Sequence, residues 1–165
     1  MNVPRWTPAY VGLGSNLEGP QQQVERGFDA LGRLPGTLLV ARSRRYRSRP
    51  LGPQDQPDFV NAAAGLLTRL DPEALLAELK QLEIMLGREQ PVRRWGPRVI
   101  DFDLLLFGAE KRATPVLTLP HPGLLERNWV LYPLQDIAPS LWVPGQGRVA
   151  DLAERLGADG IEPLT

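Results

Sequence analysis

One segment, VIDFDLLLF (residues 99–107), constrains the fold more than any other part of the chain. Apart from Asp101 and Asp103 it is wholly apolar, which is typical of a strand in the buried centre of a sheet. Successive side chains of a strand point to opposite faces, so the two aspartates share one face. The other face carries Ile100, Phe102, Leu104 and Leu106, and we expect it to pack under helices. A carboxylate in a core is costly without a cation or hydrogen-bond donors, so the acidic face needs a reason.

Two interpretations of the acidic face are open. On its own, a D-x-D pair is most simply a surface strand with solvated carboxylates. Two carboxylates roughly 7 Å apart by strand rise can also hold one or two Mg²⁺ ions, which prefer oxygen ligands and substrate phosphates. The run RRWGPR (93–98) directly upstream favours the second interpretation. Arginine suits phosphate recognition, and it would hold the anion beside a metal held by the aspartates.

The rest of the chain predicts alternating strands and helices. We expect strands at 9–14, 37–47, 58–70 and 99–107, a short hairpin after them, and helices at 20–34 and 71–87. The second helix has the clearest boundaries, with Asp71 as N-cap, Pro72 in the first turn and Gly87 at its end. This β-α-β-β-α-β order predicts an α+β fold: a ferredoxin-like antiparallel sheet with helices packed on one face, plus a C-terminal extension.

Length and charge narrow the functional classes. The 165 residues suit a single domain, 1–165. Lys+Arg and Asp+Glu both number 19, and this zero net charge argues against a dedicated nucleic-acid or anionic-membrane binder. The absence of cysteine excludes disulfides, thiolate catalysis and Cys-ligated metals. No apolar run approaches a bilayer-spanning length and no signal peptide is evident, so we expect a cytoplasmic protein without a membrane partner.

Four segments resemble a known enzyme family. RWGPRVIDFDLLLFG (94–108) closely resembles the signature R-W-G-P-R-x-[IL]-D-[IL]-D-[IL] of 6-hydroxymethyl-7,8-dihydropterin pyrophosphokinases, enzymes of folate biosynthesis. Agreement in order and spacing extends to YVGLGSNL (10–17), PLGPQDQPDFVNA (50–62) and LPHPGLLERNWVLYPL (119–134). The resemblance implies transfer of the terminal pyrophosphoryl group of ATP to the hydroxymethyl group of the dihydropterin, with release of AMP. It also implies small molecules as the partners, and we expect a monomer.

The resemblance implies roles for the residues around the phosphates. It makes Asp101 and Asp103 the ligands of two Mg²⁺ ions that clamp the triphosphate of ATP, the co-substrate. A metal near the attacking hydroxyl would lower its pKa, so a dedicated strong base is not required. Catalysis would then come from positioning and charge neutralisation, with Arg88 and Arg98 as further catalytic residues. The residues implied to bind ATP are Arg88, Trp95, Arg98, Thr118, His121 and Arg127. A lone histidine is otherwise more often structural.

On the pterin side, Phe59 and Asn61 are two residues apart in a predicted strand and share a face. A ring could therefore stack beside an amide that hydrogen-bonds the pterin edge. Trp129 stands where the family commonly has phenylalanine, as the opposing ring, although each aromatic could instead fill the core. Trp95 would close over the site. The resemblance also implies backbone contacts from Ser48 and Leu51.

Three further expectations concern supporting positions. Glu83 interrupts the leucine stripe of the second helix and is expected to hold a loop arginine. Ser15 and Asn16 are expected to cap the first helix. Gln90 and Val116 stand where better-known members carry basic residues, and Arg93 or Arg94 could compensate for the first.

Other functions explain less of the sequence. GLGSNLEG (12–19) superficially resembles a dinucleotide fingerprint, but Leu17 stands where the third glycine would be. RSRRYRSR (42–49) on such a sheet would suit RNA, yet the aromatic RNP pattern is missing. A metal-dependent nuclease or a D-x-D sugar-nucleotide transferase would share the acidic pair. Neither would explain WGPR, PHP or the asparagine in the third strand.

Overall fold

The structure is a computed structural model that describes residues 5–50, 55–87 and 99–164. The predicted strands and helices are present, and the strand predicted at 37–47 is divided into two. In chain order the elements are β1 (Thr7–Ser15), α1 (Pro20–Leu31), β2 (Thr37–Arg42), β3 (Tyr46–Ser48), β4 (Phe59–Thr68), α2 (Pro72–Met85), β5 (Asp101–Phe107), β6 (Arg112–Ala113), β7 (Thr118–Leu119), the 3₁₀ turn η1 (Leu124–Glu126), α3 (Asn128–Ile137), β8 (Trp142–Val143), β9 (Gly147–Arg148), α4 (Val149–Leu156) and β10 (Ile161–Pro163).

The main sheet is antiparallel and has β1 and β4 at its centre. Its strands follow the order β10-β3-β4-β1-β5, and β2 also pairs with β4. The predicted hairpin after β5 is present as β6 and β7. Helices and an antiparallel sheet built from separate stretches of chain confirm the α+β class.

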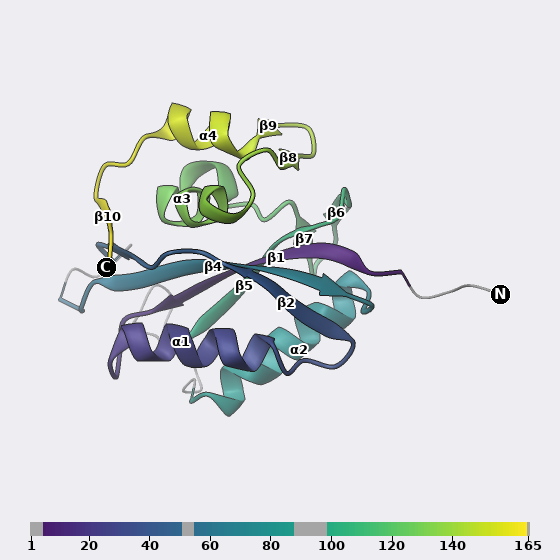
Figure 1. The fold of residues 1–165 in the computed structure, drawn as a ribbon, viewed down its shortest axis with the longest axis horizontal. Helices are drawn as coiled ribbons and strands as arrows, with labels where there is room; N and C mark the ends of the chain where they lie inside the picture. Colours follow the sequence, from purple (N-terminus) through teal and green to yellow (C-terminus); the bar gives the residue numbers. More distant parts are fainter. Residues whose placement is uncertain (1–4, 51–54, 88–98, 165) are drawn as a thin grey trace.

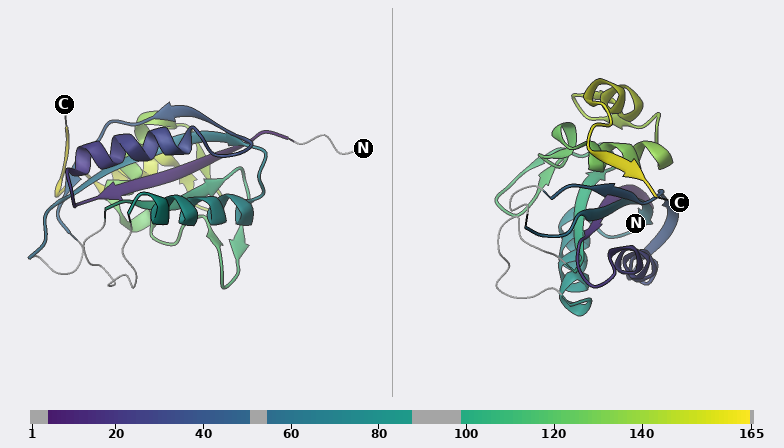
Figure 2. Two further views of the ribbon diagram at one scale, coloured as in Figure 1. Left: turned by 90° about the horizontal axis from the view of Figure 1, so that it is seen from below. Right: turned by 90° about the vertical axis from the view of Figure 1, so that its left-hand side faces the viewer.

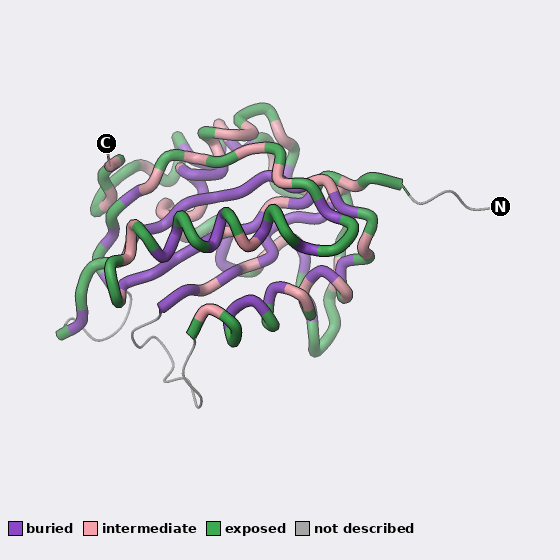
Figure 3. Tube along the Cα trace, turned by 60° about the horizontal axis from the view of Figure 1, so that its bottom comes forward, coloured by how far each residue is buried: buried purple, intermediate pink, exposed green. Residues whose placement is uncertain are grey.

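Helices cover both faces of the sheet, and the two helices predicted within the β-α-β-β-α-β core share one face, as expected. Helices α1 and α2 lie on one face, while α3 and α4 lie on the other (Figures 1 and 2). Each pair of helices encloses its own apolar core against the sheet. Figure 3 shows that the buried segments run along the strands between these layers. The C-terminal extension is therefore the second helical layer, which the second apolar face of the sheet requires.

A β-bulge in β5 changes which face its residues occupy. Tyr10 of β1 pairs with Leu106, whereas Val11 pairs with Leu104, so one residue of β5 is extra. Ile100, Phe102 and Leu104 lie in the core under α1 and α2, as predicted. Leu106 lies in the other core, with Leu105, so its predicted placement is wrong. An extra residue shifts the alternation of side chains beyond it by one.

The helix boundaries show one correct and one wrong prediction. In α2, Asp71 accepts a hydrogen bond from the backbone N–H of Ala74 at 2.8 Å, as expected of its N-cap. In α1 the N-cap is Gly19, with φ 73° and no side-chain cap, so Ser15 and Asn16 do not cap this helix. Asn16 instead donates to the carbonyl of Pro57 at 2.9 Å. None of the helices in the described ranges has both the length and the apolar character needed to cross a membrane.

Candidate active site

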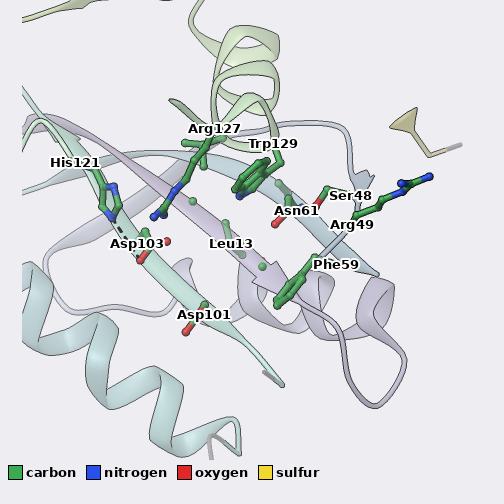
Figure 4. Close-up of a pocket in the computed structure, with 14 residues that line it drawn as sticks. Leu13, Ser48, Arg49, Phe59, Asn61, Asp101, Asp103, His121, Arg127 and Trp129 are labelled. Atoms are coloured by element: carbon green, nitrogen blue, oxygen red, sulfur yellow. Dashed lines mark hydrogen bonds and ion pairs between the residues drawn. The ribbon is translucent and has the colours of Figure 1, made fainter. Parts of the chain in front are cut away.

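A cavity of about 310 Å³ opens on the α3 side of the sheet (Figure 4). It lies where β1 and β3 end and where β4 and β5 begin. Eight residues predicted from the sequence line it together: Ser48, Phe59, Asn61, Asp101, Asp103, His121, Arg127 and Trp129. Six further lining residues were not predicted: Gly12, Leu13, Gly14, Arg49, Ala62 and Val130. The topology therefore brings segments that are far apart in sequence to one end of the sheet.

Two glycines of β1 form the floor of this cavity, and because they have no side chains they leave the space above them open. Gly14 pairs with Asp101 and Gly12 pairs with Asp103, so β1 places no side chain beside either carboxylate. On its other side, Gly14 pairs with Asn61 of β4. Directly paired residues face the same way, so Asn61, Gly14 and Asp101 form one row across the sheet. The two outer residues of this row are two strand spacings apart, roughly 10 Å.

The amide of Asn61 is held in one orientation. Its Nδ2 donates to the Ser48 hydroxyl at 2.7 Å, and both side chains are buried. Its Oδ1 then lies on the Gly14 side, where a Cβ added to Gly14 would meet it at 3.1 Å. Figure 4 shows Phe59 and Trp129 entering the cavity from β4 and from the start of α3. An acceptor and two aromatic rings thus line one end of the cavity.

His121 lies at the acidic end and is held as a neutral donor. The backbone N–H of Gly123 donates to its Nδ1 at 3.0 Å, so in the neutral ring the proton is on Nε2. Nε2 lies 3.8 Å from Oδ1 of Asp103 (Figure 4). Burial, followed by the charge of Arg127, lowers the pKa of His121 to about 4. The Asp103 carboxylate is 47% exposed and well screened, so it does not outweigh these two causes.

A second hollow of about 200 Å³ adjoins the first and shares Asp103 and His121 with it. Thr118 lies here, as do Val116 and Lys80. The rest of its lining is apolar: Leu76, Phe102, Leu104, Leu117 and Pro122. Asp103 and His121 therefore lie between the cavity lined by Phe59 and Trp129 and a mainly apolar hollow.

Glu83 supports the strand that carries the acidic pair. It is buried in α2, and its Oε2 accepts the backbone N–H of Phe102 at 2.8 Å, between Asp101 and Asp103. The arginine contact predicted for Glu83 falls on residues 88–98, outside the described residues. Also outside them are the positions predicted for Leu51, Arg88, Trp95 and Arg98, and those of Gln90, Arg93 and Arg94.

The acidic pair has the chemistry of a magnesium site. In the described ranges, no three or more His, Asp or Glu side chains gather into a metal-binding cluster. The potential metal ligands of the site are instead two carboxylates, those of Asp101 and Asp103, on one face of β5. Mg²⁺ is usually held by one or two carboxylates together with water and substrate phosphates, so the pair fits this ion without a third protein ligand.

The sequence and the fold are similar to those of known proteins. The family model for 7,8-dihydro-6-hydroxymethylpterin-pyrophosphokinase matches residues 10–139. A Pseudomonas aeruginosa protein named 2-amino-4-hydroxy-6-hydroxymethyldihydropteridine pyrophosphokinase is 47% identical over 155 residues, which cover 94% of this chain and 95% of the relative. A Haemophilus influenzae protein of the same name is 44% identical over 147 residues, 89% of this chain and 91% of the relative.

Solved structures show the same fold at low sequence identity. The Plasmodium falciparum wild-type HPPK-DHPS chain, solved with pteroate, has a TM-score of 0.75 and 12% identity. The alignment covers 98% of this chain and 48% of that chain, so this protein spans about half the length of its structural relative. The family match across most of the chain and the relatives of near-equal length agree. The chain belongs to the 7,8-dihydro-6-hydroxymethylpterin-pyrophosphokinase family.

Proposed function

We propose that this protein transfers the pyrophosphoryl group of ATP to the hydroxymethyl group of 6-hydroxymethyl-7,8-dihydropterin and releases AMP, a step of folate biosynthesis. The names of its relatives support this reaction. The observation that carries it is the row of Asn61, Gly14 and Asp101 across the cavity floor. This row lines up a hydrogen-bonding amide, an open floor and a carboxylate over a distance that suits a flat bicyclic alcohol.

The pterin lies with its ring system over Gly14 and its hydroxymethyl group toward the acidic pair. Oδ1 of Asn61 accepts an N–H of the ring edge, because Ser48 holds the amide in that orientation. Phe59 and Trp129 stack on the ring. Leu51, which lies outside the described residues, is proposed to add a backbone contact to the pterin.

The triphosphate lies between the two hollows. We propose that Asp101 and Asp103 hold two Mg²⁺ ions, which would neutralise phosphate charge and favour ionisation of the attacking hydroxyl. The Nε2–H of His121 and the guanidinium of Arg127 donate to phosphate oxygens. Arg88, Arg98 and Trp95, which lie outside the described residues, are proposed to act on ATP as the family resemblance implies. These groups hold the hydroxyl in line with the β-phosphorus.

The nucleoside end of ATP occupies the second hollow. Its apolar walls suit a base, and Thr118 offers a hydroxyl beside them. For the architecture we propose the ferredoxin-like topology, since β3, β4, β1 and β5 lie in the order that it requires. We also propose a single domain over residues 1–165 and a cytoplasmic monomer.

The test is AMP release from ATP that depends on the dihydropterin, with Mg²⁺ present. We expect activity in the parent protein and a loss of about 100-fold or more in Asp103→Ala, because several kcal/mol of charge stabilisation is removed. Asp151→Ala, an exposed aspartate of α4 paired with Arg148, is the matched control and should be as active as the parent. An inactive parent, or full activity in Asp103→Ala, would contradict the proposal.

A further inference from the structure

The turn that carries His121 leaves no room for a side chain at Gly123. A Cβ built on Gly123 would lie 2.5 Å from both Cζ and Nε of Arg127, and 2.9 Å from its Nη1. Non-bonded carbon atoms pack at about 3.5–4.0 Å, so even one methyl group would overlap the guanidinium. The charged end of Arg127 therefore lies directly against the bare backbone of residue 123, and from there it lines the cavity.

Backbone conformation does not account for a glycine at this position. Gly123 has φ −88° and ψ −2°, the conformation of the third residue of a type I turn, which does not require glycine. Alanine is therefore compatible with this backbone, and the three atoms nearest to its Cβ would all belong to the end of the Arg127 side chain. Since that end can rotate away, the turn can keep its shape while the guanidinium leaves its place.

The turn itself is anchored independently of residue size. The N–H of His121 donates to the carbonyl of Leu105 in β5 at 2.9 Å, and the N–H of Leu124 donates to the carbonyl of His121 at 3.1 Å. The N–H of Gly123 fixes the His121 ring through Nδ1. Alanine retains this N–H, so Gly123→Ala removes space and leaves the hydrogen bond of the ring intact.

We propose that Gly123 is a positioning residue: because it has no side chain, the Arg127 guanidinium can lie against its backbone and reach the phosphates. The size of residue 123 then sets the affinity for the triphosphate. This inference rests on the proposed function, because it takes the anion bound at Arg127 to be that of the nucleotide.

The experiment compares Gly123→Ala, Arg127→Ala and the double variant with the parent protein. Binding of a non-hydrolysable ATP analogue with Mg²⁺ is measured by titration calorimetry, and KM for each substrate is measured separately. We expect Gly123→Ala to weaken analogue binding about 10-fold, in line with a lost charge-assisted hydrogen bond. It should raise KM for ATP with little change in KM for the dihydropterin. In the Arg127→Ala background, Gly123→Ala should add no further loss.

The control is Gly32→Ala, at the end of α1. Gly32 has an ordinary φ of −67°, and a Cβ there would meet its nearest atom at 3.5 Å, so binding and melting temperature should match the parent. Unchanged analogue binding in Gly123→Ala would overturn the inference. The inference would also be overturned if Gly123→Ala weakened analogue binding as much in the Arg127→Ala variant as in the parent, because residue 123 would then act through the fold and not through Arg127. A parent that fails to bind the analogue would overturn the proposed function and this inference together, whereas the first two outcomes leave that function standing.

Discussion

His121 should titrate far below the range of an ordinary histidine. The ring is 20% exposed, and burial and the charge of Arg127 lower its pKa from 6.5 to about 4. A folded-state pKa below the unfolded value means that the unfolded chain binds more protons between these two pH values. The free energy of unfolding therefore falls as the pH is lowered from about 6.5 to about 4. At 1.36 kcal/mol per pKa unit, the full shift amounts to about 3 kcal/mol.

Because the chain has one histidine, its NMR signal is unambiguous. The imidazole carbon-bound protons are followed against pH in the parent and in Arg127→Ala. We expect titration near pH 4 in the parent and at a higher pH in the variant, still below 6.5 because the ring stays buried. The free energy of unfolding is also measured in urea for the parent and His121→Gln across pH 4.5–7. Because the carboxylates titrate in both proteins, the difference between the two pH profiles reports the contribution of the histidine. A ring that titrates at 6.5 or above would refute this reasoning, since attraction to Asp103 would then outweigh burial.

Two further predictions concern residues that hold the site in shape. Asn61→Ala should weaken dihydropterin binding about 10-fold and leave ATP-analogue binding unchanged, because, of the two ligands, only the pterin is proposed to contact this amide. Ser48→Ala removes the hydroxyl that accepts from the amide and should have a smaller effect. Equal losses of binding for both ligands, measured by calorimetry, would contradict this prediction. The Tyr46 hydroxyl donates to Asp136 at 2.9 Å. Burial raises the pKa of Tyr46 to about 12, so the hydroxyl keeps its proton and the hydrogen bond is present at neutral pH. Tyr46→Phe should lower the free energy of unfolding in urea by about 1.5 kcal/mol, and an unchanged value would count against this bond.

The sequence predicted the parts of the fold that local signals determine. Helix α2 follows from Asp71, Pro72 and the leucine spacing, all within a few residues of one another. The placement of Asp101 and Asp103 on one face follows from strand alternation alone. The prediction that the eight residues around the cavity belong to one site rested mainly on the family resemblance, since no local rule brings His121 beside Asp103.

Non-local packing explains most of what the sequence did not predict. Nothing near Ser15 and Asn16 indicates that Asn16 bonds to Pro57, more than 40 residues away, in place of capping α1. The second helical layer was missed because strand patterns do not tell which segment will cover the other face. The floor glycines did carry a signal: Gly12 and Gly14 alternate along β1 as the aspartates alternate along β5, and only the strand pairing shows that they meet.

The bulge in β5 shapes the end of the site that adjoins the second core. On the α3 side of the sheet, Asp101 and Asp103 line the cavity, whereas Leu105 and Leu106 lie in the second core. Regular alternation already places Leu105 on that side, and the extra residue adds Leu106, so two adjacent leucines follow the acidic pair there. A bulged residue is left out of the regular ladder, and the carbonyl of Leu105 accepts the N–H of His121. The bulge that follows the acidic stretch therefore brings Leu106 beside Leu105 in the second core, and its extra residue also anchors the turn that holds His121 near Asp103.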